Sequence, residues 1–358
     1  MPYEFPTINI AGRPVIVVQG GMGAGVSLPP LSGEVARLGA VGVVSSIGLD
    51  RLIPGQQGNY FEAARIAIED TIRRSDDRGL VGVNCMAMMH TYRDSVAGAI
   101  AGGVKAALVG AGLPLDLPRM VGDAKDVALI PIVSSVRALQ VICARWRRLG
   151  RMPDAVVVEG PLAGGHLGFK AEDIEKPEFQ LEEIFPPILQ FSKENGNFPI
   201  IVAGGIWSRA DILRWIAAGA SGVQMGTRFL ATHESGASPD FKNAVVESTS
   251  DDIFVATNPG SPSGMPFRII KSSPGYQEAL RRDRPLECKF GYMLHNGHCR
   301  AREESRDSFC ICNALLAAIW KNPDSNEMPI FTVGASAARV KKIVYVRELM
   351  DELKGVTP

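Results

Sequence analysis

One histidine in a glycine-rich loop is the residue of this chain best suited to chemistry. The loop, Glu159-Gly-Pro-Leu-Ala-Gly-Gly-His166-Leu-Gly168, follows a β-branched apolar run at residues 154–158. Runs of this kind are typical of buried strands, and glycines after a strand allow the backbone to approach a ligand closely. An imidazole titrates near neutrality, so His166 is a candidate for proton transfer. A surface turn with an incidental histidine is the alternative interpretation.

Two later loops carry glycines in a pattern that suits phosphate. Gly204 and Gly205 follow the apolar run 200–203, and Gly226 and Thr227 follow the run 222–225. Backbone N–H groups at glycines and helix starts bind phosphate oxygens that a Cβ would obstruct, and the Thr227 hydroxyl would add a donor. We therefore predict a phosphate site between these loops, for a phosphorylated cofactor or substrate. Two tight turns without a ligand are the alternative.

A regular alternation of strands and helices places these loops. Helical patterns fall between most of the apolar runs, as at residues 28–38, 60–74, 136–149 and 209–218. Strands that are apolar throughout and alternate with helices indicate a parallel sheet covered by helices. Eight such units predict the α/β class and a TIM (β/α)₈ barrel, whose active site lies at the carboxyl ends of the strands. A doubly wound open sheet is the alternative. The eight predicted strands are 14–18, 40–44, 80–83, 106–109, 127–133, 155–158, 199–202 and 222–225.

The pattern changes after residue 228. We expect residues 1–228 to form the barrel and residues 229–358 to form a C-terminal extension packed on it. Within the extension, residues 258–266 are rich in Pro, Gly and Ser and predict an extended loop. Residues 313–320 and 338–353 predict helices.

The extension also holds a group of cysteines. Thiolates and nearby imidazoles can bind zinc or an iron–sulfur cluster. The usual Cys-x₂-Cys pairs are absent, so no metal site is predicted and reduced structural thiols are the expected state. The candidate ligands are Cys288, Cys299, Cys310 and Cys312, with His295 and His298.

The bulk composition restricts the class of protein. The chain has 358 residues, of which 46% are hydrophobic and 21% charged, which is typical of a globular protein with a full core. Lys plus Arg equals Asp plus Glu, at 38 each, so no net field favours nucleic acid. No apolar run is long enough for a membrane span, and residues 1–13 lack a signal-peptide core. We expect a cytoplasmic protein; a homodimer is compatible with the sequence.

Taken in order, the strand-end motifs resemble those of the nitronate monooxygenase family, formerly called 2-nitropropane dioxygenases. The flavin-dependent enoyl-acyl-carrier-protein reductases share the same motifs. The resemblance covers residues 14–235. Its motifs are Gln19-Gly-Gly-Met22, Gly82-Val-Asn84, Gly110-Ala-Gly112, the loop from Glu159 to Gly168, Ala203-Gly-Gly-Ile206 and Gln224-Met-Gly-Thr-Arg228.

The resemblance implies a TIM barrel that binds FMN, with His166 as the catalytic residue. It implies a phosphate on Gly204, Gly205, Gly226 and Thr227. It places the isoalloxazine against Gly21, Met22 and Asn84, with Gln19, Ser134 and Gly165 nearby. The chain departs from the family pattern in one place, because Gly160-Pro-Leu162 precedes Ala163-Gly-Gly-His166 where the family has Glu directly before such a segment. The loop that carries His166 is therefore expected to differ in shape from the family pattern.

The activity implied by the resemblance is oxidation of alkyl nitronates by oxygen to a carbonyl compound and nitrite. His166 would deprotonate a neutral nitroalkane or, as imidazolium, stabilise the nitronate. The alternative is an NAD(P)H-dependent flavin reductase of the enoyl-acyl-carrier-protein or quinone type. A flavin-free phosphate-binding barrel enzyme is the third interpretation. In all three, the partner is a small-molecule substrate, with oxygen or NAD(P)H as a co-substrate in the first two.

Overall fold

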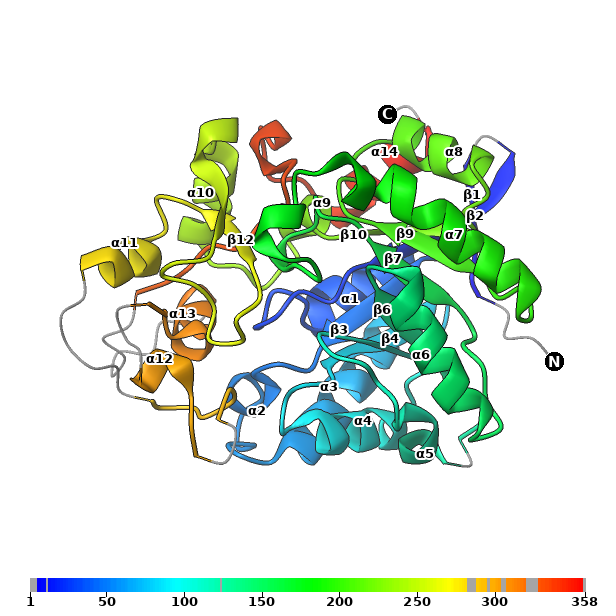
Figure 1. Cartoon of the computed structure of the whole chain (residues 1–358), viewed down its shortest axis with the longest axis horizontal. Helices are drawn as coiled ribbons and strands as arrows, with labels where there is room; N and C mark the ends of the chain where they lie inside the picture. Colours follow the sequence, from blue (N-terminus) through cyan, green and yellow to red (C-terminus); the bar gives the residue numbers. More distant parts are fainter. Residues whose placement is uncertain are drawn as a thin grey trace.

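Eight parallel strands between residues 13 and 225 close into a barrel (Figure 1). The structure is a computed structural model that describes residues 5–10, 12–122, 124–281, 288–294, 297–303, 307–319 and 328–356. Pairing of β2 with both β3 and β10 closes the sheet, so the predicted barrel is confirmed and the open sheet is not. The barrel strands are β2 (Arg13–Gln19), β3 (Val41–Ser45), β4 (Leu80–Met86), β5 (Ala106–Gly110), β6 (Ala128–Val133), β7 (Val156–Glu159), β9 (Ile200–Ala203) and β10 (Gly222–Met225).

The apolar runs form strands because both faces of the sheet are buried. Side chains alternate along each strand: in β2, Ile16 and Val18 fill the barrel interior, whereas Val15 and Val17 pack outward against the helices. All eight predicted strands are present, with ends that differ by a few residues at most. A short strand β1 (Ile8–Ile10) pairs antiparallel with β2.

Helices cover the outer face of the barrel (Figure 1). The helix predicted at 136–149 is α6, and its Ser135 N-cap accepts a hydrogen bond from the Ala138 N–H. The barrel helices are α1 (Pro29–Arg37), α2 (Leu49–Leu52), α3 (Tyr60–Ser75), α4 (Tyr92–Ala101), α5 (Leu117–Val121), α6 (Val136–Arg147), α7 (Leu181–Glu194), α8 (Arg209–Ala217) and α9 (Thr227–Leu230), with 3₁₀ turns η1 (Ala171–Asp173) and η2 (Pro177–Phe179) before α7. Every strand thus ends in a loop that points to one mouth.

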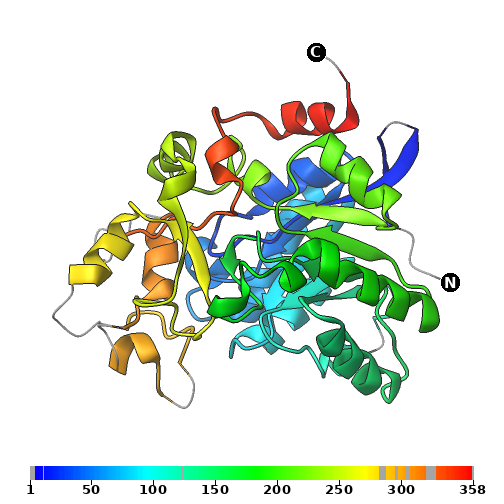
Figure 2. The ribbon, with the colours of Figure 1, turned by 45° about the horizontal axis from the view of Figure 1, so that its top comes forward.

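The described residues after α9 form a separate layer beside the mouth, the C-terminal layer (Figure 2). The end of the chain then returns to the barrel. A small antiparallel sheet in the order β11-β12-β8 joins this layer to the histidine loop, because β8 (Gly165–His166) belongs to that loop. The last helix, α14, packs on α1, α8, α9 and β1. The other elements are α10 (Pro239–Glu247), η3 (Ser250–Asp252), β11 (Ile253–Ala256), β12 (Phe267–Ile270), α11 (Pro274–Arg281), α12 (Arg300–Glu303), α13 (Ile311–Ala317), η4 (Ala337–Arg339) and α14 (Val346–Lys354).

The helix predicted at 338–353 is wrong in its first half. Residues between η4 and α14 are extended, and Val344 pairs with Thr232 in a parallel bridge while its carbonyl accepts the His233 N–H at 2.9 Å. This tertiary pairing overrides the helical pattern. The helix predicted at 313–320 begins earlier, at Ile311, and residue 320 lies outside the described residues. Across the described ranges, no helix combines the length and the apolar character that crossing a bilayer requires.

Candidate active site

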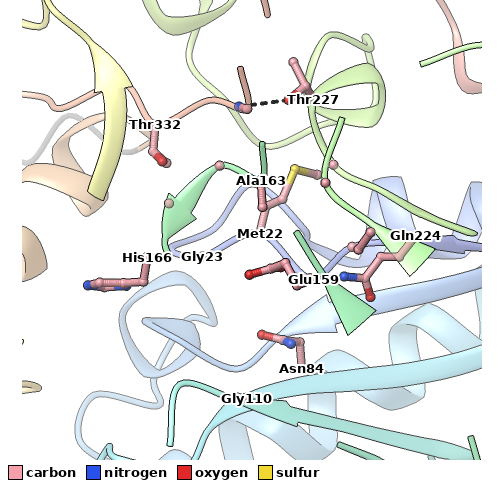
Figure 3. A pocket seen from close by; sticks show the side chains of 18 of the residues that line it. Met22, Gly23, Asn84, Gly110, Glu159, Ala163, His166, Gln224, Thr227 and Thr332 are labelled. Carbon is pink, nitrogen blue, oxygen red and sulfur yellow. Dashed lines mark hydrogen bonds between the residues drawn. The ribbon is translucent and has the colours of Figure 1, made fainter. Parts of the chain in front are cut away.

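The carboxyl ends of the barrel strands and the C-terminal layer enclose a cavity of about 260 Å³ (Figure 3). Its walls are made of glycine-rich loops on the barrel side and of residues 332–336 with Phe267 and Leu315 on the other side. No lysine or arginine is among the described residues that line it. An anionic group in this cavity would therefore depend on backbone N–H groups and hydroxyls.

One end of the cavity is lined by the two glycine loops for which a phosphate site is predicted. Gly204 and Gly205 have φ of +94° and +82°, which L-residues with a Cβ rarely adopt. A Cβ on Gly204 would lie 2.8 Å from the Gly160 carbonyl oxygen. From the opposite side, the Gly334 N–H donates to Thr227 Oγ1 at 3.0 Å (Figure 3). The two predicted loops therefore meet here, and residue 334 completes the end that they form.

The other end carries buried polar atoms that face the cavity. Gly21 packs against Asn84, because a Cβ on Gly21 would lie 2.1 Å from the Asn84 Cβ. Ser45 Oγ and Gln224 Oε1 are buried in the cavity wall and form no hydrogen bond within the described part of the chain. Buried polar atoms normally have partners. A polar ligand that reached this wall would find a free hydroxyl and a free amide oxygen there.

His166 lies at the junction of the barrel loop and the C-terminal layer. Strand β8 places it opposite Phe267 of β12, with the two ring centroids 4.7 Å apart. Its Nε2 lies 2.7 Å from Ser261 Oγ, and Figure 3 shows the ring turned away from Glu159. Burial lowers the pKa of His166 to about 4. The imidazole is therefore neutral at pH 7, which favours a proton acceptor over an imidazolium.

Glu159 is a cavity residue that the sequence predictions did not include. It ends β7 and lines the cavity (Figure 3). Burial raises the pKa of Glu159 to about 7, so the carboxyl holds a proton in a substantial fraction of molecules at neutral pH. The sequence signal was its place as the first residue of the histidine loop.

Most predicted site residues line this one cavity. Gln19 does not: its side chain is fully buried, its Oε1 accepts the Val43 N–H at 3.0 Å, and its Nε2 donates to Ser27 Oγ at 2.7 Å. Ser134 is likewise absent from the wall and lies against Gly168, where a Cβ would be 2.5 Å from the serine Oγ. The predicted residues that do line the cavity are Gly21, Met22, Asn84, Gly165, His166, Gly204, Gly205, Gly226 and Thr227.

Residues of the C-terminal layer complete the wall, and sequence reasoning missed them. Thr332, Gly334, Ser336 and Phe267 follow no barrel strand. Their position depends on contacts across the chain, such as the Thr332 hydroxyl donating to the Arg268 carbonyl at 2.9 Å. No local pattern in the sequence marks them.

The cysteines form a group of thiols away from this cavity. Cys299, Cys310 and Cys312 pack together around Ala301. A hydrogen bond to Cys310 and burial raise the pKa of the Cys312 thiol, so thiolates are disfavoured. Within the described residues, no three His, Cys, Asp or Glu side chains are arranged to hold a metal ion. His298 is bonded instead to Glu303, with Nδ1 2.7 Å from Oε1, and residue 295 lies outside the described ranges.

The fold and the site define a TIM-barrel protein of the α/β class whose cavity opens at the carboxyl ends of the strands. The model of the nitronate monooxygenase family matches residues 62–355. The chain therefore belongs to the nitronate monooxygenase family.

Curated relatives match part of the chain, and solved structures share its fold. Probable nitronate monooxygenases of Staphylococcus saprophyticus and Staphylococcus haemolyticus are 36% and 38% identical over 104 residues, and these matches span 28% of this chain and 28% of each relative. FabK from Thermotoga maritima superposes with a TM-score of 0.70 at 24% identity over 96% of this chain and 92% of that one. Nitroalkane oxidase from Streptomyces ansochromogenes gives a TM-score of 0.64 at 19% identity over 95% of each chain. These likenesses show the shared fold.

Proposed function

We propose that this chain is an FMN-dependent oxidoreductase that oxidises alkyl nitronates with oxygen to a carbonyl compound and nitrite. The observation that carries the proposal is the cavity itself. It combines an anion end made of glycines, a wall with two orphaned polar atoms, and one neutral imidazole at the far side. Membership of the nitronate monooxygenase family and the likeness to a nitroalkane oxidase support the same activity.

The residues of the cavity fit FMN. The phosphate would lie against the backbone of Gly204, Gly205 and Gly226, with the Thr227 hydroxyl beside it. The pyrimidine edge of an isoalloxazine offers both donors and acceptors, which matches the orphaned Ser45 and Gln224 atoms. Bound FMN would supply the electron transfer between substrate and oxygen, while the protein supplies position and electrostatics.

The role of the protein residues follows from their protonation and contacts. His166, as neutral imidazole, would accept a proton from the carbon of a neutral nitroalkane and so form the nitronate in place. The Ser261 hydroxyl at 2.7 Å and the Phe267 ring hold the imidazole in one orientation. A partly protonated Glu159 would keep negative charge low in the wall, where a nitronate anion has to approach.

An NAD(P)H-dependent reductase is the second candidate, and one feature of the cavity favours it. Apolar side chains of Ile47, Met86 and Leu315 line the same cavity and would suit a long acyl chain. The enoyl reductase domain of MlnA from Bacillus amyloliquefaciens superposes with a TM-score of 0.64, at 13% identity. Both candidates use the flavin, so only the electron donor separates them.

Anaerobic flavin spectroscopy tests the proposal. The purified protein is mixed without oxygen with an alkyl nitronate or, separately, with NADH and NADPH. We expect the flavin absorbance to bleach with nitronate alone. Bleaching with a nicotinamide alone would favour the reductase. A protein that shows no flavin absorbance after addition of FMN would instead be a flavin-free phosphate-binding barrel enzyme, and the proposal would be wrong.

A further inference from the structure

A buried arginine of the C-terminal layer holds the histidine loop of the barrel. Arg268 lies in β12, and its Nη1 donates to the Pro161 carbonyl at 2.6 Å and to the Ala163 carbonyl at 2.5 Å. The side chain is only 6% exposed. One nitrogen therefore bridges two carbonyls of the loop that leads to His166.

The contact is chemically unusual because the cation has no anionic partner. No described carboxylate forms an ion pair with Arg268. Burial alone lowers the pKa of Arg268 to about 10, so the guanidinium stays protonated at neutral pH. Burying a charge is costly unless hydrogen bonds compensate for it. The loop carbonyls provide this compensation, so the guanidinium and the loop have to keep a fixed relative position.

The backbone around these bonds continues into the site. Gly165 is paired with Arg268 and His166 with Phe267 in the β8–β12 ladder. The Leu167 N–H donates to the Pro266 carbonyl at 2.9 Å, so the loop is bound to the same strand after the histidine as well. Between these anchors, Leu162, Ala163 and Gly164 line the cavity.

We propose that Arg268 is a positioning residue, which fixes the loop 160–166 and through it the place of His166 over the cavity. The catalytic consequence rests on the proposed function, whereas the structural role does not. The guanidinium holds the segment 161–163, where this loop departs from the family pattern. Arg268 itself does not line the cavity within the described structure.

Amide hydrogen exchange on the flavin-free full-length protein tests this role directly. The variant Arg268→Met keeps a long side chain but removes the charged donors. Hydrogen bonds from a charged group stabilise the closed loop, so their loss lowers the free energy of local opening. We therefore expect about ten- to hundredfold faster exchange in a peptide covering residues 160–168. Exchange in a peptide covering β4 should stay unchanged. Arg214→Met, which removes an exposed arginine of α8 that is paired with Glu182 of α7, is the matched control and should change neither peptide.

Kinetics then separate positioning from binding. In Arg268→Met, we expect kcat with a nitroalkane to fall at least about tenfold while KM changes little, because substrate still enters but meets a misplaced base. Arg268→Lys restores the charge without the planar fork and should recover part of both kcat and loop protection. Unchanged exchange at residues 160–168 in Arg268→Met would overturn the proposal, as would a uniform rise over the whole barrel.

Two further outcomes keep the test decisive. Where Arg268→Met does not fold, Arg268→Gln, which removes the charge and shortens the reach of the donor, is measured in the same peptide, and exchange equal to that of the unsubstituted protein would overturn the proposal. Where the protein binds no flavin or does not oxidise nitronates, the exchange measurement still stands, since it needs neither. Failure of the proposed function and failure of this inference are therefore distinguishable.

Discussion

The two sides of the cavity are built in different ways. The barrel side is made of short motifs at strand ends, in which neighbouring residues such as Gly204 and Gly205 or Gly226 and Thr227 form one local structure. The C-terminal side is made of scattered residues that only long-range contacts hold, such as Gly334 on Thr227, 107 positions away. The first kind of wall follows from local sequence, and the second follows only from the whole fold.

His166 belongs to both sides. Its loop leaves β7 of the barrel, yet its pairing partner is β12 and its hydrogen-bond partner is Ser261, both in the C-terminal layer. Under the proposed function, the barrel provides the cofactor end, and the C-terminal layer sets the geometry of the chemical step. Each of the following experiments disturbs one side and measures the other.

Replacing the imidazole should have the largest effect. We expect His166→Ala to lower turnover of a nitroalkane by about 10²–10⁴-fold, the usual loss for a missing general base. FMN affinity, measured by flavin fluorescence quenching, should stay close to that of the unsubstituted protein because the phosphate end is untouched. Turnover that survives the substitution would remove His166 from the mechanism.

The next largest effect is expected from a methyl group added where the histidine loop packs against the C-terminal layer. A Cβ on Gly164 would lie 2.6 Å from the Val333 carbonyl carbon and 2.7 Å from the Gly334 nitrogen. Gly164→Ala should therefore separate the C-terminal layer from the barrel loop and cost about 1–3 kcal/mol, as overpacking does. Thermal unfolding and FMN titration would both detect the change.

Gly226→Ala is the matched control for this clash. Its Cβ would meet no described atom closer than Met22 Sδ at 3.6 Å, so the unfolding temperature without ligand should not move. Equal destabilisation by Gly164→Ala and Gly226→Ala would show that the packing of Gly164 against Val333 and Gly334 does not determine the loss of stability.

Loss of one hydroxyl should have a smaller effect. Ser261→Ala removes the hydrogen bond to His166 Nε2, and we expect kcat to fall about tenfold, the value of one buried hydrogen bond. Ser308→Ala removes a neighbouring bond, from Ser308 Oγ to the Gly260 carbonyl at 3.1 Å, without touching the histidine. An equal loss in both variants would mean that the loop as a whole, and not the Ser261 hydroxyl, determines kcat.

The pH dependence of stability should have opposite signs for the two buried groups. The pKa of His166 is lowered to about 4, so its stabilisation is present above pH 6.5 and is lost as pH falls toward 4. The pKa of Glu159 is raised to about 7, so folding is favoured below pH 4.5 and this advantage is lost as pH rises through 7. Unfolding temperatures of Glu159→Gln across this range should lack the second trend. The same slope in the variant would assign that trend to other groups.

The sequence predicted the barrel well because its information is local. Continuous apolar runs with helices between them are sufficient to specify parallel strands that are buried on both faces, and the strand-end glycines mark the mouth. Local pattern failed where tertiary pairing decides: residues 340–345 are extended because Val344 pairs with Thr232. It also failed for Gln19, whose polar side chain satisfies backbone groups in the core instead of a ligand. Ser45 and Arg268 could not be predicted, since their roles depend on burial and on partners far along the chain.

The pairing of β8 with β12 has a consequence for how the protein is made. The hydroxyl partner of His166 is encoded 95 positions after it, so at about 5–20 residues per second the ribosome adds it roughly 5–20 s later. All eight barrel strands are synthesised before that moment, because β10 ends at Met225. A nascent chain halted there would carry the strands of the barrel but no ordered histidine loop. Activity is therefore expected to appear only when the last third of the chain has emerged from the ribosome. A chain truncated after the barrel strands is expected to be inactive.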